Sequence, residues 1–470
     1  MSDDILARLR QLQAGDVPVH GGRTLAYVYD SGLEEADRIG REAVAAYAGS
    51  NGLDPTAFPS LLAMENDLVA FARSLVDGPD TMVGSVTSGG TESVLLAVQG
   101  ARDSRPDIVH PTMVLPSTAH AAFHKAAHYF GVEAVVVPVG AGHRADAAAM
   151  AAAIDHDTVL VVASAPSYAH GVVDPVATIA AAAVARGVRC HVDACIGGWV
   201  LPYAARLGRD VEPWTFAVEG VTSISVDLHK YAYTPKGASL LLHRSPALRR
   251  PQFFAWAGWP GYTMLNPTMQ STKSGGPLAG AWAVVNTIGD DGYLALNAQV
   301  LDGMDRLVDA IEQIPELRVV ETPDSTLVAI EADVSCDVFT IADELASVGW
   351  LAQAQLSYAG EPATLHLSLS AATAPLIDEF RTALEAAVAR AVAAGPVAVD
   401  DGIAEFVRAL DAAALSDQEF DELLAAVGMT GGAGLPDRMA EINSLLDLAA
   451  PQLREALLSA FLDRLLRPAD

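Results

Sequence analysis

Residues 225–244, SVDLHKYAYTPKGASLLLHR, carry a lysine, Lys230, directly after His229 and between two runs with the composition of β-strands. An ammonium group is normally left at the protein surface, because burying it without a partner is costly. Lys230 is therefore either a surface lysine whose stem packs on apolar neighbours or a group that the chemistry of a site requires. The rest of the chain decides between these two interpretations.

The composition is that of a large, acidic globular protein. The chain has 470 residues, 51% of them hydrophobic, which is enough for two or three domains with a sizeable core. It carries 58 acidic and 29 basic side chains, a net charge of −29. Most of such a surface repels phosphate backbones and anionic membranes, so we predict no nucleic-acid partner.

Cysteine usage and the start of the chain favour the cytoplasm. The three cysteines form no CxxC pair and no disulfide framework, which is typical of a reducing compartment. The opening MSDDILARLRQLQ lacks the apolar core of a signal peptide, and no apolar run approaches the roughly 18 residues of a membrane span. We expect a cytoplasmic protein with no segment that crosses a bilayer.

Short β-branched runs alternate with alanine-rich helical runs between about residues 81 and 244, a rhythm that predicts an α/β fold. Several of these runs are continuously apolar, as expected for parallel strands covered on both faces by helices. We predict a mostly parallel central sheet of about seven strands, with ligand sites outside the carboxyl ends of the strands. The candidate strands are TMVGSVT, TMVLPS, EAVVVPV, TVLVVASAP, VRCHVDA, VTSISVD and ASLLLH.

The pattern of predicted strands and helices changes after the last strand of this sheet. After about residue 301 come two further strand patterns, LRVVETPDSTLVAIEAD and ATLHLSLS, and the helix APLIDEFRTALEAAVARAV, which predict a smaller α/β domain. AAGPVAVDDG is typical of a linker, and the remainder predicts a helical tail in which Ser416 caps a helix. The predicted segments are 1–75, packing on a partner subunit or the small domain; 76–300, the large domain; 301–395, the small domain; and 396–470, the linker and tail.

A glycine turn follows the first strand of the predicted sheet. In SVTSGGTES the strand meets Gly89 and Gly90, and a helix opens at Thr91 and Glu92. Glycines let a ligand approach the backbone closely, and the free N–H groups of a helix start attract phosphate. The alternative is an ordinary strand-to-helix turn capped by Thr91.

A carboxylate, Asp193, ends the strand of VRCHVDACIGGW. A carboxylate at a buried strand end needs a positive or hydrogen-bonding partner, so Asp193 is either a helix cap or a ligand contact. Lys230 ends the next strand region, so a carboxylate, an amine and an anion cradle converge on one edge of one sheet. Pyridoxal 5′-phosphate needs all three, because its aldehyde bonds a lysine, its ring nitrogen must stay protonated and its phosphate suits a helix start.

Five phrases, in order, resemble the sphingosine-1-phosphate lyase branch of the group II pyridoxal-phosphate decarboxylases. They are VTSGGTES, HAAFHKAAHYFG, SAPSYAHGVVDP, HVDACIGGW and GVTSISVDLHKYAYTPKGASLLL, and the similarity extends over roughly residues 29–395. The resemblance implies the aspartate aminotransferase-like fold type I, a homodimer with shared active sites, and pyridoxal phosphate as the cofactor.

The resemblance also implies roles for individual residues. Lys230 is expected to form the Schiff base, Asp193 to contact the pyridine nitrogen and His120 to stack on the ring. The phosphate contacts implied are Gly90, Thr91 and His229 and, from a neighbouring subunit through PTMQSTKSGG, Ser271 and Thr272.

Two proton-transfer groups are expected near the cofactor. Lys230 must attack as a neutral amine, so we expect desolvation to lower its pKa from the usual value of about 10.4. Once a substrate displaces it, the freed amine is placed to act as an acid or a base. Tyr233, in KYAYTPKG, matches a family tyrosine and is assigned either to proton transfer or to packing.

A metal site is the rival interpretation of HAAFHKAAHYF. His120, His124 and His128 have the i, i+4, i+8 spacing that places three imidazoles on one helical face. The run lacks the glutamate of an HExxH hydrolase, and no Cys or carboxylate cluster nearby suggests a fourth ligand. We therefore predict no metal.

The substrate is a small amine, and pocket geometry selects the bond that breaks. Retro-aldol cleavage of a Cα–Cβ bond, the reaction of the lyase branch, is the favoured prediction; an L-amino-acid decarboxylase is the enzyme alternative. A non-enzymatic relative that uses the tail after Gly402 as a contact surface is the third interpretation.

The expected substrate contacts are Tyr29, Asp54 and Lys273. Asp54 stands in NGLDPTAFP where relatives carry a histidine associated with the substrate phosphate. A like-charge pair ~4 Å apart is unfavourable by about 4 kcal/mol at an effective dielectric of ~20, so a phosphate site there requires a cation such as Lys273. The alternative is that Asp54 caps the turn before Pro55.

Overall fold

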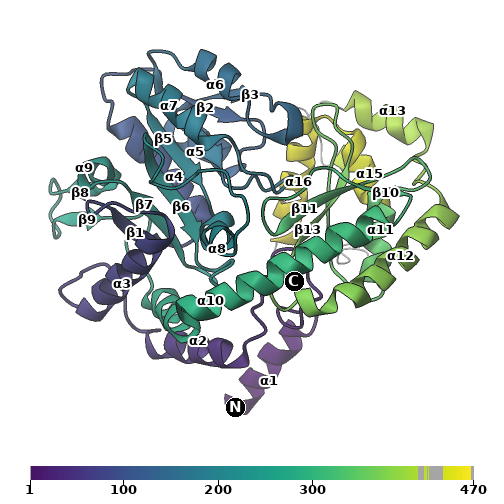
Figure 1. Cartoon of the computed structure of the whole chain (residues 1–470), viewed down its shortest axis with the longest axis horizontal. Helices are drawn as coiled ribbons and strands as arrows, with labels where there is room; N and C mark the ends of the chain where they lie inside the picture. Colours follow the sequence, from purple (N-terminus) through teal and green to yellow (C-terminus); the bar gives the residue numbers. More distant parts are fainter. Residues whose placement is uncertain (1, 411–417, 421, 423–437, 467–470) are drawn as a thin grey trace.

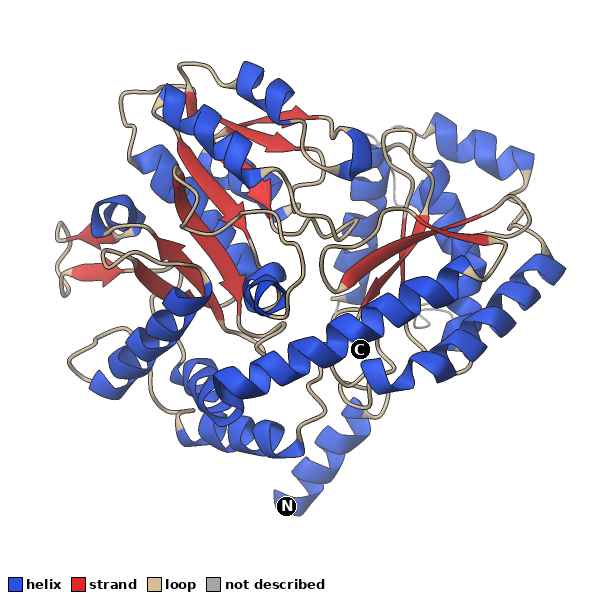
Figure 2. Cartoon of the chain, in the orientation of Figure 1, coloured by secondary structure: helices blue, strands red, loops and turns tan. Residues whose placement is uncertain are grey.

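The computed structural model describes residues 2–410, 418–420, 422 and 438–466. Two sheets with helices around them lie side by side, joined by one long helix that runs along both (Figures 1 and 2). The larger sheet has seven strands and the smaller has four. No helix in the described ranges is long and apolar enough to cross a membrane.

The central sheet confirms the seven predicted strands. Its order is β1-β7-β6-β5-β4-β2-β3, and all strands run parallel except β7, which is antiparallel to β1 and β6. The strands are β1 (Val83–Thr87), β2 (Thr112–Pro116), β3 (Glu133–Val137), β4 (Thr158–Ser164), β5 (Arg189–Asp193), β6 (Val221–Asp227) and β7 (Ser239–His243). Strands β2, β4 and β7 are buried along their whole length, which explains their continuously apolar sequences.

Helices cover both faces of this sheet. Successive side chains of a strand point to opposite faces, so Met113 and Leu115 of β2 join one core cluster while Val114 joins the other. The covering helices are α4 (Gly90–Asp103), α5 (Ala122–Phe130), α6 (Ala147–Ala153), α7 (Val176–Arg186) and α8 (Leu201–Arg206). The predicted α/β architecture, with helices on both sides of a parallel sheet, is confirmed.

Helix α10 (Gly275–Glu312) links the two sheets. It is interrupted at Gly289, whose φ of 64° and ψ of 173° are not helical. The predicted boundary at residue 300 falls inside this helix, so the two domains share an element. Helices α2 (Glu34–Ala46) and α3 (Pro59–Leu75) pack against α10 of the same chain.

The small domain is a four-stranded antiparallel sheet with helices on it. Its order is β10-β11-β13-β12, and the sequence predicted all of these strands except the three-residue β12. The backbone N–H of Leu25 donates to Leu351 O, so part of the N-terminal segment packs on the small domain. The elements are β10 (Leu317–Val319), β11 (Leu327–Ala332), α11 (Val338–Ala346), β12 (Gln353–Gln355), β13 (Thr364–Ser368) and α12 (Ile377–Ala394).

A hairpin of β8 (Phe254–Trp256) and β9 (Met264–Asn266) projects from the large domain, and the sequence did not predict it. It exposes a group of large apolar side chains, each at least 43% accessible: Phe254, Trp256, Trp259, Tyr262, Leu265 and Met269. Helix α9 (Pro246–Arg249) precedes the hairpin, and α1 (Ser2–Gln13) extends from the lower edge of the molecule in Figure 1.

The C-terminal tail contains α13 (Asp401–Ala409), α15 (Ala440–Leu448) and α16 (Pro451–Leu465). It docks on the small domain, where the Asp343 carboxylate accepts hydrogen bonds from the backbone N–H groups of Met439 and Ala440, both at 2.9 Å. The predicted cap Ser416 lies outside the described residues.

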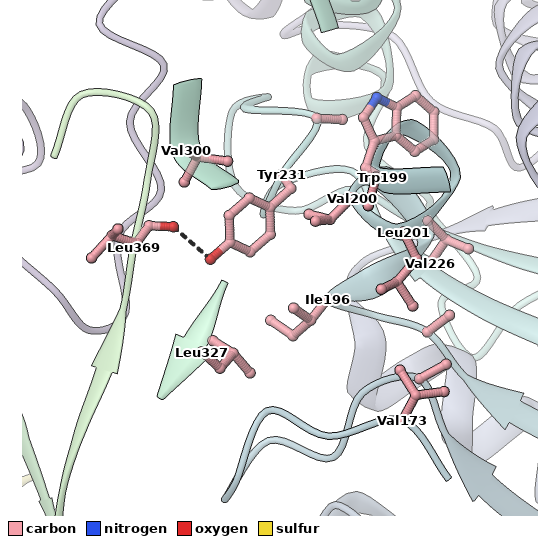
Figure 3. Close-up of a cluster of buried hydrophobic side chains, with 14 of the residues drawn as sticks. Val173, Ile196, Trp199, Val200, Leu201, Val226, Tyr231, Val300, Leu327 and Leu369 are labelled. Atoms are coloured by element: carbon pink, nitrogen blue, oxygen red, sulfur yellow. Dashed lines mark hydrogen bonds between the residues drawn. The ribbon is translucent and has the colours of Figure 1, made fainter. Parts of the chain in front are cut away.

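The two domains share an apolar core next to the lysine region. Figure 3 shows Tyr231 pointing from the large domain toward Leu369 and Leu327 of the small domain. The Tyr231 hydroxyl donates to the Leu369 carbonyl oxygen at 2.8 Å, and both residues are fully buried. Side chains on either side of Tyr231, including Ile196 and Val300, fill the same cluster. The backbone that carries Lys230 is therefore anchored in the interdomain core.

A buried carboxylate, Asp174, organises the loop after β4. Its two oxygens accept the backbone N–H groups of Ala145 at 2.8 Å and Ser164 at 2.7 Å. Burial raises the pKa of Asp174 to about 6, although these hydrogen bonds and Arg144 act in the opposite direction. Arg144 in turn binds Asp324 of the small domain at 2.6 Å.

We expect Asp174→Ala to lower the free energy of unfolding by about 2–5 kcal/mol, because it leaves two backbone N–H groups without acceptors. The raised folded-state pKa means that this carboxyl adds stability at low pH, which is lost as the pH rises through about 6. The loss should therefore be larger at pH 5 than at pH 8 in urea denaturation.

Asp146 provides a matched control, because it also accepts two backbone N–H groups, those of Ala148 and Ala149, but at an exposed helix start. Asp146→Ala should cost only about 1 kcal/mol. Equal losses for the two variants would contradict the assignment of Asp174.

Candidate active site

A cavity of ≈340 Å³ opens at the carboxyl ends of β1, β4, β5 and β6, the edge of the sheet at which the sequence predicted a ligand site. Six predicted residues line it together: Gly90, Thr91, His120, Asp193, His229 and Lys230. The sequence missed several others that also line it, among them Glu92, Tyr168, Cys195 and Asp227.

Lys230 forms an ion pair inside the cavity with Asp227. The distance from Lys230 Nζ to Asp227 Oδ2 is 2.8 Å, and the Asp227 side chain is only 2% exposed. Burial lowers the pKa of Lys230, as expected, but the charge of Asp227, helped by Cys195 and Tyr29, outweighs burial and raises it. The expectation of a lowered pKa is therefore wrong for the cofactor-free chain, in which Lys230 is a paired ammonium.

The same pair keeps Asp227 ionised. Burial favours the neutral carboxyl, but the charges of Lys230 and His229 prevail and lower the pKa of Asp227. One oxygen, Asp227 Oδ1, is buried and has no hydrogen-bond partner. The cavity thus holds a carboxylate that is compensated mainly by the lysine.

The glycine turn brings the backbone close to this pair. Helix α4 begins at Gly90, its N-cap is Gly89, and no side chain caps it, so the alternative of a Thr91 cap is wrong. A Cβ on Gly90 would lie 2.8 Å from both Asp227 oxygens and 2.9 Å from Cys195 Sγ. Only glycine fits there, and the first N–H groups of α4 are left without acceptors inside the helix.

Asp193 and His120 approach the cavity from different elements. Asp193 ends β5, is 9% exposed, and its Oδ1 accepts the N–H of Cys195 at 3.1 Å and the hydroxyl of Ser225 at 3.3 Å. His120 lies in the turn before α5, where its Nδ1 accepts the N–H of Ala122 at 3.1 Å.

The three histidines do not share a helical face. His120 precedes the first residue of α5, whereas His124 and His128 lie within that helix and are exposed. Of the three, only His120 lines the cavity. The i, i+4, i+8 spacing therefore does not place three imidazoles side by side, because the first histidine lies in a turn and the other two lie in an amphipathic helix.

The cavity has the groups that pyridoxal phosphate requires. It contains a lysine, an acid at a strand end, and a helix start where only glycine fits. A further buried atom, His229 Nδ1, has no hydrogen-bond partner among the described residues, and His229 lines the cavity. Burial lowers the pKa of His229, with Asp227 acting in the opposite direction. Orphaned donors near a helix start suit an anionic ligand.

Tyr233 does not line this cavity. It is 6% exposed, and its hydroxyl accepts the backbone N–H of Ala371 at 3.2 Å. Its φ of 54° belongs to the left-handed region, which turns the side chain toward the small domain. This position favours packing, the second of the two roles considered for Tyr233.

Asp54 and Lys273 line a second cavity, of ≈710 Å³, beside the exposed hairpin. Lys273, one cation considered to make a phosphate site possible beside Asp54, pairs through its Nζ with Glu65 at 2.7 Å. The Asp54 carboxylate accepts the N–H of Thr56 at 2.8 Å and its hydroxyl at 2.7 Å, which agrees with the turn-capping alternative. The two predicted contacts Ser271 and Thr272 are exposed and adjoin Lys273 in the chain.

Tyr29 and Lys236 lie on the small-domain side of Lys230. Burial raises the pKa of Tyr29, and Lys230 acts in the opposite direction, so the two groups interact. Lys236 Nζ lies 5.0 Å above the centre of the Tyr29 ring and donates to Tyr27 O at 3.0 Å. Burial, with the charge of Lys230, lowers the pKa of Lys236 to about 8. Sequence reasoning missed Lys236, although it lies within the quoted lysine motif.

Two family descriptions match this chain. Residues 29–252 match the pyridoxal-dependent decarboxylase conserved domain, and residues 401–464 match the pyridoxal-dependent enzyme, C-terminal putative HTH domain. The first match contains all the named residues that line the cavity around Lys230. The second covers most of the predicted tail.

Individual relatives are similar over most of the chain. The sphingosine-1-phosphate lyase of Arabidopsis thaliana is 34% identical over 411 residues, which cover 85% of this chain and 74% of the relative. The solved structure of the Burkholderia pseudomallei sphingosine-1-phosphate lyase has a TM-score of 0.78 and 33% identity, covering 83% of this chain and 91% of that one. The Lactobacillus brevis glutamate decarboxylase, with a TM-score of 0.73 and 19% identity over 82% of this chain and 92% of that one, shares the fold.

We expect Asp227→Asn to make Lys230 react with an aldehyde at lower pH. Without the carboxylate, burial dominates and the pKa of Lys230 falls, so more of the neutral amine is present at a given pH. The probe is pyridoxal, which lacks the phosphate, so that a change in phosphate repulsion does not enter. The measurement is the rate at which visible absorbance develops in cofactor-free protein between pH 6 and 10.

Glu65→Gln is the matched control, because it breaks a lysine–carboxylate pair of the same length in the second cavity. Its rate profile with pyridoxal should follow that of the unmodified protein. A profile for Asp227→Asn that coincides with both would show that the ion pair does not control Lys230.

Proposed function

This chain belongs to the sphingosine-1-phosphate lyase family of pyridoxal-phosphate-dependent lyases, and from that premise we propose that it breaks the Cα–Cβ bond of a small amino substrate. The observation that carries the proposal is the convergence of Lys230, Asp193 and the Gly90 turn on one cavity. Pyridoxal phosphate, when bound, supplies the electron sink for the carbanion that such cleavage leaves.

We assign roles to the residues that line the cavity. When the cofactor is bound, Lys230 would hold its aldehyde, Asp193 would accept a hydrogen bond from the protonated ring nitrogen and His120 would stack on the ring. The phosphate is held by the N–H groups at the start of α4, by Gly90 and Thr91, and by His229. This assignment is supported by the unpartnered His229 Nδ1 and by the lack of space for any side chain at Gly90.

Lys230 also moves the proton at the reacting carbon. Its nitrogen lies 2.8 Å from Asp227, which stabilises the protonated state and thus holds the proton that the freed amine must deliver. Tyr29 interacts with Lys230, whereas the Tyr233 hydroxyl is occupied by Ala371, so we assign the assisting hydroxyl to Tyr29.

The substrate carries a β-hydroxyl and, we infer, an anionic group. Lys230 lines the cavity, and Lys236 lies close enough for the charge of Lys230 to lower its pKa, so two basic side chains are available near a bound anion. Asp54 lies in the second cavity of the same chain, so within one copy it does not repel an anion bound beside that copy's Lys230. A phosphorylated amino alcohol of the kind named in the relatives is consistent with this charge pattern.

Decarboxylation of an L-amino acid is the second candidate. The match to the pyridoxal-dependent decarboxylase conserved domain favours it, because that domain contains the whole cavity. The two reactions need the same cofactor and differ only in which substituent of the α-carbon stands perpendicular to the ring.

The active enzyme is, in our proposal, a cytoplasmic homodimer with shared sites. The exposed apolar hairpin and the second cavity form a surface that a second copy of this chain would bury, with Ser271 and Thr272 of each copy reaching the phosphate of the other. The three cysteines are buried and unpaired, which agrees with a reducing compartment.

We do not propose a nucleic-acid partner, although the family description that matches the C-terminal tail names a putative HTH domain. Residues 401–464 contain 12 acidic and 4 basic side chains. A DNA-binding helix-turn-helix needs a basic surface for the phosphates. We infer that this tail serves contacts within the protein, as the docking of α15 on Asp343 illustrates.

The test of function is a product analysis with a Lys230 control. Phosphorylated β-hydroxy amines should yield an aldehyde, whereas L-amino acids should yield no carbon dioxide. Borohydride reduction of the holoenzyme should place the cofactor mass on the peptide containing Lys230. Lys230→Ala should lose the visible absorbance and at least about 10²–10⁴-fold of the turnover. Carbon dioxide without aldehyde would favour the decarboxylase, and a label on another peptide would refute the site.

Shared sites predict complementation between inactive variants. Lys230→Ala and Thr272→Asp are each expected to be inactive, but their mixed dimers contain one intact site, because Lys230 and Thr272 of a site come from different copies. Random mixing should restore about a quarter of the activity, since half of the dimers are mixed. Lys230→Ala mixed with Asp193→Asn is the control and should restore nothing, because both residues belong to one copy. Equal outcomes would exclude sharing.

A further inference from the structure

A fully buried histidine, His191, connects to Asp193 through a serine on the neighbouring strand. His191 lies two residues before Asp193 on β5 and is 0% exposed. Its Nδ1 is 2.9 Å from the Ser223 hydroxyl, and its Nε2 is 3.2 Å from the Ser225 hydroxyl, both on β6. Ser225 then donates to Asp193 Oδ1 at 3.3 Å. Neither His191 nor the two serines line the cavity.

The hydrogen bonds fix the tautomer of His191. An ionised carboxylate only accepts, so the single hydrogen of the Ser225 hydroxyl goes to Asp193. Ser225 must then accept from His191, which places the ring proton on Nε2 and leaves Nδ1 to accept from Ser223. The Cys195 thiol also points its hydrogen at Ser225 Oγ, at 3.4 Å. Each hydroxyl and each ring nitrogen in this chain of contacts therefore has a partner.

We propose that His191 and Ser225 are positioning residues that hold Asp193 as a fixed, ionised acceptor for the ring nitrogen of the cofactor. This inference rests on the proposed contact between Asp193 and that nitrogen. The Ser225 hydroxyl and the Cys195 N–H both bind Oδ1, so the other oxygen remains available toward the cavity. A carboxylate held in this way stabilises the protonated ring nitrogen more than a mobile carboxylate does, because it does not have to reorient before it accepts the hydrogen bond.

The groups around His191 keep the direction of this chain of hydrogen bonds, in which His191 donates to Ser225 and Ser225 donates to Asp193. Burial lowers the pKa of His191 to about 4, with Asp193 acting in the opposite direction, so the imidazole is neutral under physiological conditions. The other titratable groups around Asp193 are Cys195, whose pKa burial raises, and Asp227 and Lys230 across the cavity, which form their own pair. His120 also lines the cavity. None of these groups forms a hydrogen bond with His191, so none of them moves its ring proton from Nε2 to Nδ1.

The first test uses the unmodified protein without cofactor. Long-range proton–nitrogen spectra of histidine-labelled protein should show His191 as the Nε2–H tautomer between pH 6 and 8, with its signal identified by its loss in His191→Phe. An Nδ1–H tautomer would overturn the proposal, since Ser225 would then have to donate to His191 rather than to Asp193.

The second test follows the ring nitrogen of ¹⁵N-labelled pyridoxal phosphate in the holoenzyme. Ser225→Ala should move the ring-nitrogen resonance toward the unprotonated value and weaken cofactor binding about tenfold, the effect of one hydrogen bond to a charged group. His191→Phe should move the resonance in the same direction. Ser223→Ala is the matched control, since it removes a hydroxyl from the same strand and the same imidazole without touching Asp193.

Asp193→Asn separates the possible outcomes. If Asp193→Asn moves the ring-nitrogen resonance while Ser225→Ala has the same effect as Ser223→Ala, the positioning role of His191 and Ser225 is refuted. The proposed contact between Asp193 and the ring nitrogen is then retained. If Asp193→Asn leaves the resonance unchanged, the proposed contact between Asp193 and the cofactor fails and the positioning role fails with it. A graded series, with Asp193→Asn largest, Ser225→Ala next and Ser223→Ala near zero, is the expected result.

Discussion

The ion pair between Lys230 and Asp227 is the constraint around which the cavity is arranged. Both groups are largely withdrawn from water, and a charge in that position must be paired. The pair places the amine at the end of β6, opposite the glycine turn at the start of α4. Gly90 has no room for a Cβ because the Asp227 oxygens occupy that space. The position of the lysine and the identity of the glycine therefore follow from one interaction.

The interdomain core holds this arrangement in place. Tyr231, the residue after Lys230, is buried between the two sheets and bonded to the Leu369 carbonyl oxygen. Arg144 and Asp324 tie the far side of the large domain to the small domain. A strand-end lysine flanked by such anchors has little freedom to swing, which suits a residue that must leave and return to one reacting atom. The small domain is thus part of the site even where it does not line the cavity.

The sequence predicted the central sheet well because its strands carry a strong signal. Runs such as 158–164 are buried on both faces, so every side chain is constrained and the apolar composition is continuous. The β8–β9 hairpin and β12 have three-residue strands with exposed or half-buried side chains, which leave no such pattern. The predicted cavity residues were strand ends and turn glycines, which a linear motif can mark.

The residues that sequence reasoning misplaced depend on distances between elements. Asp227 was visible three positions before Lys230, but its pairing with the amine follows from the turn after β6 and not from spacing. Lys273 was one cation considered to offset Asp54, and its pairing with Glu65 of α3 could not be read from the sequence. Tyr233 and Tyr231 are two residues apart, and the positive φ of Tyr233 directs its hydroxyl toward Ala371 rather than into the cavity. Ion-pair partners and side-chain directions of this kind can be determined only from the three-dimensional structure.

The carboxylates of the cavity explain how an acidic site can accept an anionic cofactor. Glu92 is compensated by the backbone N–H groups of Ser88 and Met269, and Asp193 by Ser225 and the Cys195 N–H. Asp227 depends on Lys230, so its charge would be left buried if the lysine nitrogen lost its proton. Asp227 therefore favours any state in which the Lys230 nitrogen stays protonated, whether free or covalently engaged. Asp227 also repels a nearby phosphate. The free N–H groups at the start of α4 and the unpartnered Nδ1 of His229 are placed to offset this repulsion.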